Sequence, residues 1–248
     1  MKTTRKVALV TGATKGIGKA ICNKLSKLDM NLIITARDLA SLEKLKNQLN
    51  AIGKGEVILI EADLTKETDI KRVVDKSLDH FGSIDILINN AGIGIFKRID
   101  QFTCSEYERI FNLNVRSVFL LTKYVVPQMI NRKSGQIINI SSIAGKNGFK
   151  TGSLYSASKH AIQGFTWSLR EDVKEFGIKV TTVCPGSVAT GFGGKNMNEI
   201  SQVEWSLEPE DVAHAISFLV TESDTVNTAE MIIKPKYNLR TIDWNTRK

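Results

Sequence analysis

The sequence is poor in the residues that build disulfide frameworks and metal clusters. Its three cysteines, Cys22, Cys104 and Cys184, are an odd number and contain no Cys-x-x-Cys pair. Neither a disulfide framework nor a zinc site is therefore expected, and a reducing cytoplasm is the simplest location. The three histidines lie too far apart in the sequence to suggest a cluster, so we predict no metal.

Long hydrophobic runs are also missing. Residues 1–10 contain a basic segment followed by only a short apolar stretch, which is far from a secretory core. No later stretch approaches the roughly 20 apolar residues that cross a bilayer. The chain has no internal repeat, low-complexity segment or linker. We therefore expect a cytoplasmic protein with no membrane partner.

The positive charge is spread out rather than concentrated. The chain has 34 Lys and Arg against 26 Asp and Glu, a net charge of +8, but no run of five or more basic residues. A nucleic-acid partner is therefore not expected, and a phosphorylated cofactor would account for part of the excess. At 42% hydrophobic and 24% charged, the composition is typical of globular proteins, and 248 residues fit a single domain, 1–248.

Strand and helix patterns alternate along the chain. Short apolar runs predict strands at residues 7–10, 32–35, 57–60, 84–88, 136–140 and 179–183, with a last strand at 231–233. Amphipathic patterns predict helices at residues 16–29, 68–80, 105–130, 153–175 and 209–220, and a further helical face is shared by Leu39, Leu42, Leu45 and Leu49. This alternation indicates an α/β fold, a Rossmann-type doubly wound, mainly parallel sheet of about seven strands with helices on both faces.

Two segments lack strong periodicity. Residues at about 190–206 are rich in Gly, Asn and Ser and are interpreted as a substrate lid. Residues 238–248 are interpreted as a polar C-terminal tail.

A glycine-rich turn follows the first predicted strand and opens the first predicted helix. Such a turn lets the backbone approach a pyrophosphate, and the helix N-terminus offers N–H groups and a partial positive charge. The spacing Gly-x-x-x-Gly-x-Gly differs from the commonest dinucleotide fingerprint. The residues of the turn that we expect to bind the cofactor are Gly12, Thr14, Lys15, Gly16, Ile17 and Gly18.

The end of the second predicted strand favours NADP(H). The position where an acidic residue would bind the ribose of NAD is Ala36, whereas Arg37 and Lys15 supply cations for a 2′-phosphate. Asp38 is expected to cap the next helix. Asp63, after the third strand, either accepts a hydrogen bond from the adenine or forms a turn.

A tyrosine and a lysine four residues apart predict a catalytic pair. On a helix, Tyr155 and Lys159 project from one face, and the lysine charge is expected to lower the pKa of the phenol toward the working range. Ser142, at the carboxyl end of a predicted strand, can hydrogen-bond a substrate oxygen, with Ser141 as the competing choice.

These motifs together resemble the short-chain dehydrogenase/reductase family in its common form of about 250 residues. The resemblance covers nearly the whole chain and rests on residues 11–18, Asp63-Leu64, Asn89-Asn90-Ala91-Gly92, Asn114, Ser142, Tyr155-x-x-x-Lys159 and Pro185-Gly186. It implies an NADP-dependent hydride transfer between the cofactor and a ketone, aldehyde or secondary alcohol, with Tyr155 as the general acid or base. The family pattern also implies that Asn114 holds a water on a proton relay to Lys159.

The resemblance implies further cofactor contacts. Leu64, Asn90, Ala91, Gly92, Pro185 and Gly186 would flank the cofactor, Asn89 would stabilise the sheet, and Val188 and Thr190 would contact its nicotinamide amide or phosphates. Lys159 would also bind the nicotinamide ribose. A homodimer or homotetramer is expected.

The substrate remains open at this stage. An apolar pocket is expected from Phe149, Phe192, Met197 and Trp205, with ordinary packing as the alternative. Family members that act on acyl-carrier thioesters usually have a glycine-rich segment after the last strand, and residues 231–236 lack one. The chain therefore more closely resembles the branch of the family that reduces varied ketones, aldehydes or pterin side chains. A 3-oxoacyl thioester reductase with an acidic carrier protein is the alternative enzyme, and a non-catalytic NADP-binding sensor is the alternative from another class.

Overall fold

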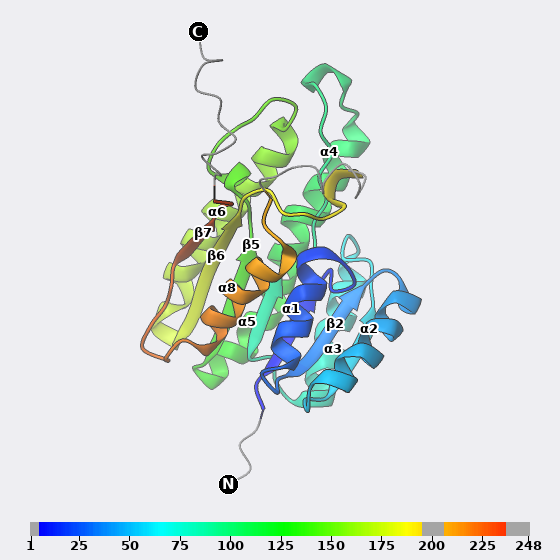
Figure 1. Ribbon diagram of the computed structural model, residues 1–248. Helices are drawn as coiled ribbons and strands as arrows, with labels where there is room; N and C mark the ends of the chain where they lie inside the picture. Colours follow the sequence, from blue (N-terminus) through cyan, green and yellow to red (C-terminus); the bar gives the residue numbers. More distant parts are fainter. Residues whose placement is uncertain (1–4, 195–205, 237–248) are drawn as a thin grey trace.

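The computed structural model describes residues 5–194 and 206–236, and its centre is one seven-stranded, fully parallel sheet (Figure 1). The strand order is β3-β2-β1-β4-β5-β6-β7. The strands are β1 (Val7–Thr11), β2 (Asn31–Ala36), β3 (Val57–Glu61), β4 (Ile86–Asn89), β5 (Gly135–Ile140), β6 (Ile178–Pro185) and β7 (Glu230–Ile233). The order reverses between β1 and β4, and the Rossmann-type fold predicted from the sequence is confirmed.

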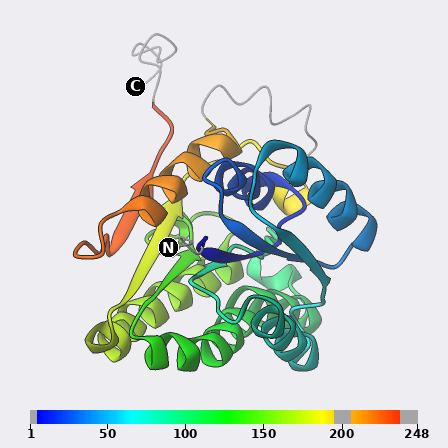
Figure 2. The same ribbon diagram turned by 90° about the horizontal axis from the view of Figure 1, so that it is seen from below.

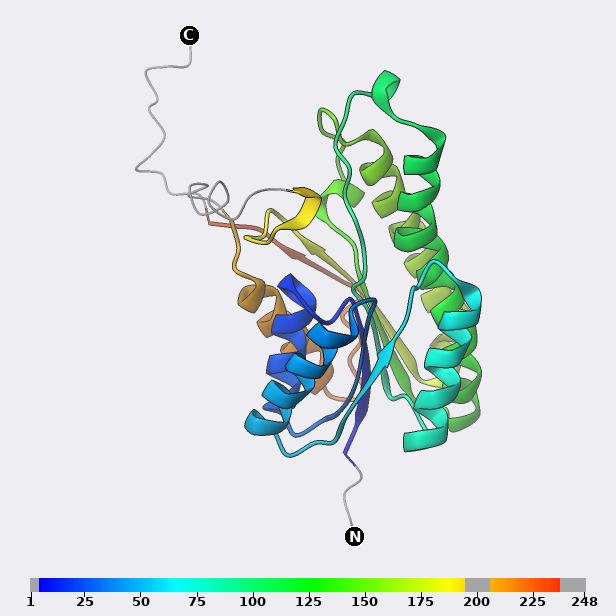
Figure 3. The same ribbon diagram turned by 90° about the vertical axis from the view of Figure 1, so that its right-hand side faces the viewer.

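Helices cover both faces of the sheet. Figure 2 and Figure 3 show one group of helices on each side: α1 (Gly16–Ser26), α2 (Leu39–Ile52) and α8 (Pro209–Thr221) on one face, and α3 (Glu67–Phe81), α5 (Ser117–Arg132) and α6 (Ser153–Val173) on the other. Each layer has its own cluster of buried apolar side chains. Because all strands are parallel, their carboxyl ends lie along one edge, the upper one in Figure 1.

The helix expected over residues 105–130 is divided into three parts. The structure has α4 (Cys104–Phe111), a π-helical segment η2 (Asn112–Arg116) and then α5. The chain stays helical throughout, which is why the apolar periodicity predicted one helix. π-Helical insertions of this kind inside α-helices are frequent at functional sites.

Several element boundaries differ from the sequence-based prediction. β4 begins at Ile86 rather than at Ile84; Asp85, just before it, accepts a hydrogen bond from the Val7 N–H of β1 at its carboxylate (2.7 Å). Leu39 is 42% exposed, so the buried face of α2 consists only of Leu42, Leu45 and Leu49. Leu39 is the first residue of the helix, where the apolar face has not yet begun.

The expected lid and tail fall largely outside the described residues, as do Met197 and Trp205. Short 3₁₀ turns complete the described part: η1 (Ile99–Gln101), η3 (Ile143–Gly145), η4 (Lys174–Phe176) and η5 (Phe192–Gly194). None of the helices in residues 5–194 and 206–236 is long and apolar enough to cross a membrane.

Candidate active site

The glycine-rich turn between β1 and α1 has a backbone conformation and a close packing that residues with a side chain would not allow. Gly12 and Gly16 have positive φ angles of 63° and 50°. A Cβ atom on Gly18 would lie 2.2 Å from the Gly12 carbonyl oxygen, so this closely packed turn requires glycine there. At the N-terminus of α1, Lys15 is the N-cap and makes no side-chain cap bond. The backbone N–H groups in the first turn of α1 therefore form the kind of site that binds anions.

The loop after β4 is tied to this turn. Asn90 Nδ2 donates to the carbonyl oxygens of Thr11 (2.8 Å) and Gly12 (3.2 Å). The Thr11 hydroxyl accepts from the backbone N–H of Asn90 (2.9 Å) and of Ala91 (3.0 Å). The two loops at the strand-order reversal thus form one unit, which brings together residues that are about 80 positions apart in the sequence.

The segment after β6 also contacts the glycine turn. A Cβ atom on Gly16 would lie 3.0 Å from Thr190 Cγ2. Val188 pairs with Leu207 in a parallel bridge, and the Gly186 N–H donates to the Ile233 carbonyl (2.7 Å). These bonds fix the path of residues 186–190 along the carboxyl edge of the sheet.

Two cations flank the glycine turn. Lys15 and Arg37 are both exposed, and neither forms an ion pair with another described residue. Asp38 caps α2, because its carboxylate accepts from the Ser41 N–H (3.2 Å) and hydroxyl (2.8 Å). The capping role predicted for Asp38 is therefore confirmed.

Asp63 follows β3 and forms a local turn. Its Oδ1 accepts from the Thr65 N–H (3.1 Å) and hydroxyl (2.8 Å), while its own N–H donates to Asp69 (2.8 Å). These contacts agree with the alternative that Asp63 forms a turn. Leu64 beside it is buried in the core.

The predicted catalytic side chains meet at the start of α6. Lys159 Nζ lies 5.8 Å from the centre of the Tyr155 ring and donates to the Ile140 carbonyl at the end of β5 (2.8 Å). Ser142 begins the turn that follows β5, its hydroxyl accepts from the Ala144 N–H (3.1 Å), and its interaction with the phenol lowers the pKa of Tyr155. The competing Ser141 is buried and donates instead to the Lys159 carbonyl (3.1 Å). The structure thus favours Ser142 over Ser141 as the residue that faces the phenol.

Burial shifts the pKa values of this pair in opposite directions. Desolvation raises the pKa of Tyr155 to about 12, against a smaller lowering by the hydrogen bond with Ser142. Desolvation also lowers the pKa of Lys159 to about 8. The expectation that the lysine charge would lower the tyrosine pKa is wrong for the protein alone, because removal of the phenol from water dominates. The phenol therefore keeps its proton at neutral pH.

Asn114 lies in the π-helical segment η2 and is fully buried. Its Oδ1 accepts from the Ile93 N–H (2.9 Å), and its Nδ2 donates to the Ile93 carbonyl (2.9 Å) and to the Ser158 hydroxyl (3.1 Å). A Cβ atom on Gly92 would lie 3.2 Å from Asn114 Oδ1 and 3.8 Å from Lys159 Nζ, so Asn114 and Lys159 are close neighbours. The supporting role of Ser158 was not visible in the sequence, although its place between Tyr155 and Lys159 is a usable signal.

Aromatic rings surround Tyr155. Phe96 lies edge-on to the Tyr155 ring at 5.5 Å between centres, and Phe192 lies against it at 5.6 Å. Phe149 contacts Phe96, at 5.8 Å, rather than Tyr155. The sequence analysis named Phe149 and Phe192 but missed Phe96. Its position four residues after Gly92, in the loop at the carboxyl end of a strand, was the signal available.

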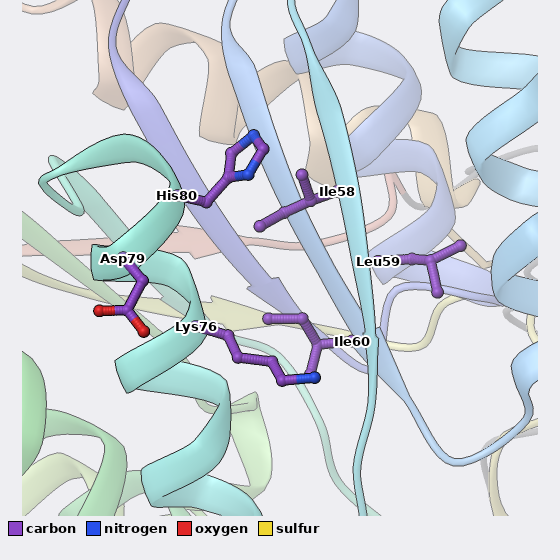
Figure 4. Close-up of a pocket in the computed structure, with 6 residues that line it drawn as sticks. All are labelled: Ile58, Leu59, Ile60, Lys76, Asp79 and His80. Atoms are coloured by element: carbon purple, nitrogen blue, oxygen red, sulfur yellow. The ribbon is translucent and has the colours of Figure 1, made fainter.

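A separate pocket of about 360 Å³ lies at the far edge of the sheet, between β3 and α3 (Figure 4). Its lining residues are Ile58, Leu59, Ile60, Lys76, Asp79 and His80. Figure 4 shows Leu59 on the opposite side of the strand from Ile58 and Ile60, and His80 is paired with Glu56 at 2.7 Å. The pocket contains none of the predicted site residues. No group of His, Cys, Asp and Glu within the described residues could hold a metal ion.

Known proteins resemble this chain over most of its length. The family model for short chain dehydrogenase matches residues 6–201. An uncharacterized oxidoreductase of Staphylococcus epidermidis is 32% identical over 235 residues, 94% of this chain and 99% of that protein. A metagenomic short-chain oxidoreductase solved with NADP is 32% identical with a TM-score of 0.83, covering 94% of this chain and 98% of that one.

The solved structures differ in the cofactor they carry. A 3-ketoacyl-(acyl-carrier-protein) reductase of Brucella melitensis in complex with NADH is 27% identical with a TM-score of 0.84, over 92% of this chain and 96% of that one. Further similar structures contain NADP, NADPH or 5-hydroxy-NADP. The comparisons thus support a nicotinamide cofactor.

Proposed function

The chain belongs to the short-chain dehydrogenase family and is an oxidoreductase, and from this premise we propose that it reduces a ketone or aldehyde, or oxidises the corresponding alcohol, with NADP(H). Residues 1–248 would act as one catalytic domain in the cytoplasm, assembled as a homodimer or homotetramer. The observation that carries the proposal is that the buried Tyr155 and Lys159 lie together with the half-buried Ser142 at the carboxyl edge of the sheet.

The glycine turn fits a dinucleotide. The close approach of Gly18 to Gly12 leaves the backbone bare at the N-terminus of α1, which suits a pyrophosphate. The positions for the remaining cofactor contacts are Gly12, Thr14, Lys15, Gly16, Ile17, Asp63, Leu64, Asn90, Ala91, Gly92, Pro185, Gly186, Val188 and Thr190. Arg37 and Lys15, without described carboxylate partners, would hold the 2′-phosphate that distinguishes NADP from NAD.

When bound, the reduced nicotinamide supplies the hydride. Tyr155 supplies the proton to the substrate oxygen: its phenol is protonated at neutral pH, although the raised pKa opposes release of that proton. Ser142 orients that oxygen from the end of β5. Lys159 stabilises the phenolate left after donation, and Asn114, adjacent to Lys159, supports return of the proton.

Binding and turnover measurements test the proposal. Titration of the protein with NADPH and with NADH by fluorescence is expected to give tighter binding of NADPH, and absorbance at the nicotinamide band is expected to fall when a ketone is added. The Arg37→Ala variant should weaken NADPH binding by about tenfold and leave NADH binding unchanged, since the lost contact is worth about 1.4 kcal/mol. Equal affinity for both cofactors in the parent would contradict the proposed role of Arg37.

A 3-oxoacyl thioester reductase is the second candidate. Its specific support is the similarity to the Brucella melitensis reductase, and the +8 charge would suit an acidic carrier protein. Activity that depends on the carrier protein would favour this candidate, whereas equal or better activity on free ketones favours the first. Binding of NADPH without turnover of any carbonyl compound would favour a sensor.

A further inference from the structure

Phe96 is the least expected member of the group around Tyr155, and its role depends on the reductase function proposed above. Three aromatic side chains come from three separate loops at the carboxyl edge of the sheet: Phe96 after β4, Phe149 after β5 and Phe192 after β6. The ring contacts run from Phe149 to Phe96, from Phe96 to Tyr155 and from Tyr155 to Phe192, with centre-to-centre distances between 5.5 and 5.8 Å. These distances are typical of favourable aromatic pairs.

Glycines in the same loops make room for the rings. A Cβ atom on Gly94 would lie 2.6 Å from the Phe192 ring and 2.7 Å from the Phe96 ring. A Cβ atom on Gly193 would lie 2.4 Å from Phe96. Because Gly94 and Gly193 have no side chains, the Phe96 ring fits between their two loops, next to Phe192.

The loop that carries Phe96 is fixed at both ends. On one side, Asn114 makes two hydrogen bonds to the backbone of Ile93. On the other side, the Lys97 N–H donates to the Thr151 carbonyl (2.9 Å), and the Lys97 side chain pairs with Glu106 at 2.5 Å. Phe96 is thus held in a defined position, as a recognition residue requires, rather than on a loose loop.

The surface that results is apolar and partly open. Phe149 is 47% exposed and Phe192 is 37% exposed, whereas Phe96 is half-buried. The cation nearest to Phe96 in the sequence, Lys97, is neutralised by Glu106. Exposed aromatic surface next to the proton-donating phenol favours substrates with an apolar ring over charged or highly polar ones.

We propose that Phe96 is a specificity-determining residue, which forms with Phe149 and Phe192 an aromatic wall that selects ketones bearing an uncharged ring next to the carbonyl. The substrate ring packs against Phe96 while its carbonyl oxygen meets the hydroxyls of Tyr155 and Ser142. Linear acyl thioesters gain little from this wall, because a flexible chain must be ordered to lie against it.

The test compares kcat/KM with NADPH for acetophenone, butanone and acetoacetyl-CoA in the parent and in variants. The parent is expected to prefer acetophenone. Phe96→Ala should lower kcat/KM for acetophenone about 10- to 100-fold and leave butanone within about twofold, because only the ring contact is lost. Phe96→Tyr, which keeps a ring at this position, should retain the preference. The matched control is Phe218→Ala, an exposed phenylalanine on α8 on the other face of the sheet, which should change neither substrate.

Each other result overturns a defined part of the account. An equal loss on acetophenone and butanone in Phe96→Ala means that Phe96 only supports Tyr155. A gain on acetophenone means that Phe96 blocks the pocket. Preference of the parent for acetoacetyl-CoA contradicts the substrate class but leaves carbonyl reduction intact. If the parent reduces none of the compounds, the proposed function fails and this inference fails with it.

Discussion

At the scale of single residues, Tyr155 and Lys159 share one buried environment on α6. The same desolvation raises the pKa of the phenol and lowers that of the ammonium group, since burial disfavours the charged form of each. Lys159 has no carboxylate partner among the described residues, and its bond to the Ile140 carbonyl compensates only part of the lost hydration. The structure therefore keeps a costly buried lysine at the position where the proposed mechanism needs it.

The first prediction concerns stability and pH. The folded-state pKa of Lys159, about 8, is below its ordinary value of 10.5, so the folded protein binds fewer protons than the unfolded chain between these values. The contribution of Lys159 to the free energy of unfolding should therefore rise with pH from 8 to 10.5, by up to about 3 kcal/mol. Lys159→Met removes this rise.

Urea unfolding at pH 7 and at pH 10 measures the effect. Lys159→Met should be more stable relative to the parent at pH 7 than at pH 10. The control Lys44→Met, at an exposed position on α2, should keep the parent's pH dependence. The same pH dependence in Lys159→Met and the parent would contradict burial of a charged lysine.

At the scale of elements, sequence periodicity predicted the sheet and most helices but missed the π-helical segment. Periodicity reports which side chains face the core, whereas in η2 the buried residue is the polar Asn114 and Leu113 is only partly buried against the core. Within η2, Asn114 hydrogen-bonds the Ile93 backbone and the Ser158 hydroxyl. These contacts join distant parts of the chain, so the periodicity of the sequence cannot predict them. Phe96 was missed for a similar reason, because part of the space for its ring is made by Gly193, which lies in another loop.

The second prediction tests the contacts of η2. Asn114→Ala removes three hydrogen bonds and leaves the Ile93 backbone groups without their partner, which should lower the free energy of unfolding by about 1–3 kcal/mol. Turnover should also fall, since the Phe96 loop loses one anchor. Asn112→Ala, two residues earlier, alters a half-buried residue of the same segment and should change both quantities little. Urea unfolding and steady-state rates measure these effects, and equal losses in both variants would argue against a specific role of Asn114.

The third prediction tests the glycine turn. Gly18→Ala places a methyl group 2.2 Å from a backbone oxygen, so the turn must deform, and NADPH binding should weaken by at least about tenfold. Gly164→Ala provides the matched control, because a Cβ at that position on α6 meets nothing within 4 Å. It should stabilise the protein by about 0.5–1 kcal/mol through helix propensity and leave binding unchanged. Unweakened NADPH binding in Gly18→Ala would contradict cofactor binding at this turn.

At the scale of the whole molecule, the parallel order of the strands explains why a sequence could reveal so much of the site. Parallel strands end at one edge, so Gly12, Asn90, Ser142 and Thr190, which are far apart in the sequence, were expected together and lie along that edge. The pKa of Tyr155 could not be predicted in the same way. It depends on how completely the surrounding loops and rings bury the phenol, which is a property of the packed molecule.

The central claim is that Tyr155 is the proton donor of an NADPH-dependent carbonyl reduction. The most direct test is Tyr155→Phe, which removes the hydroxyl and keeps the ring packed against Phe96 and Phe192. NADPH oxidation in the presence of a ketone that the parent reduces should fall by at least about 100-fold, as expected for loss of a general acid, while NADPH affinity by fluorescence titration should stay within about threefold. Turnover by Tyr155→Phe at the parent's rate would contradict the account.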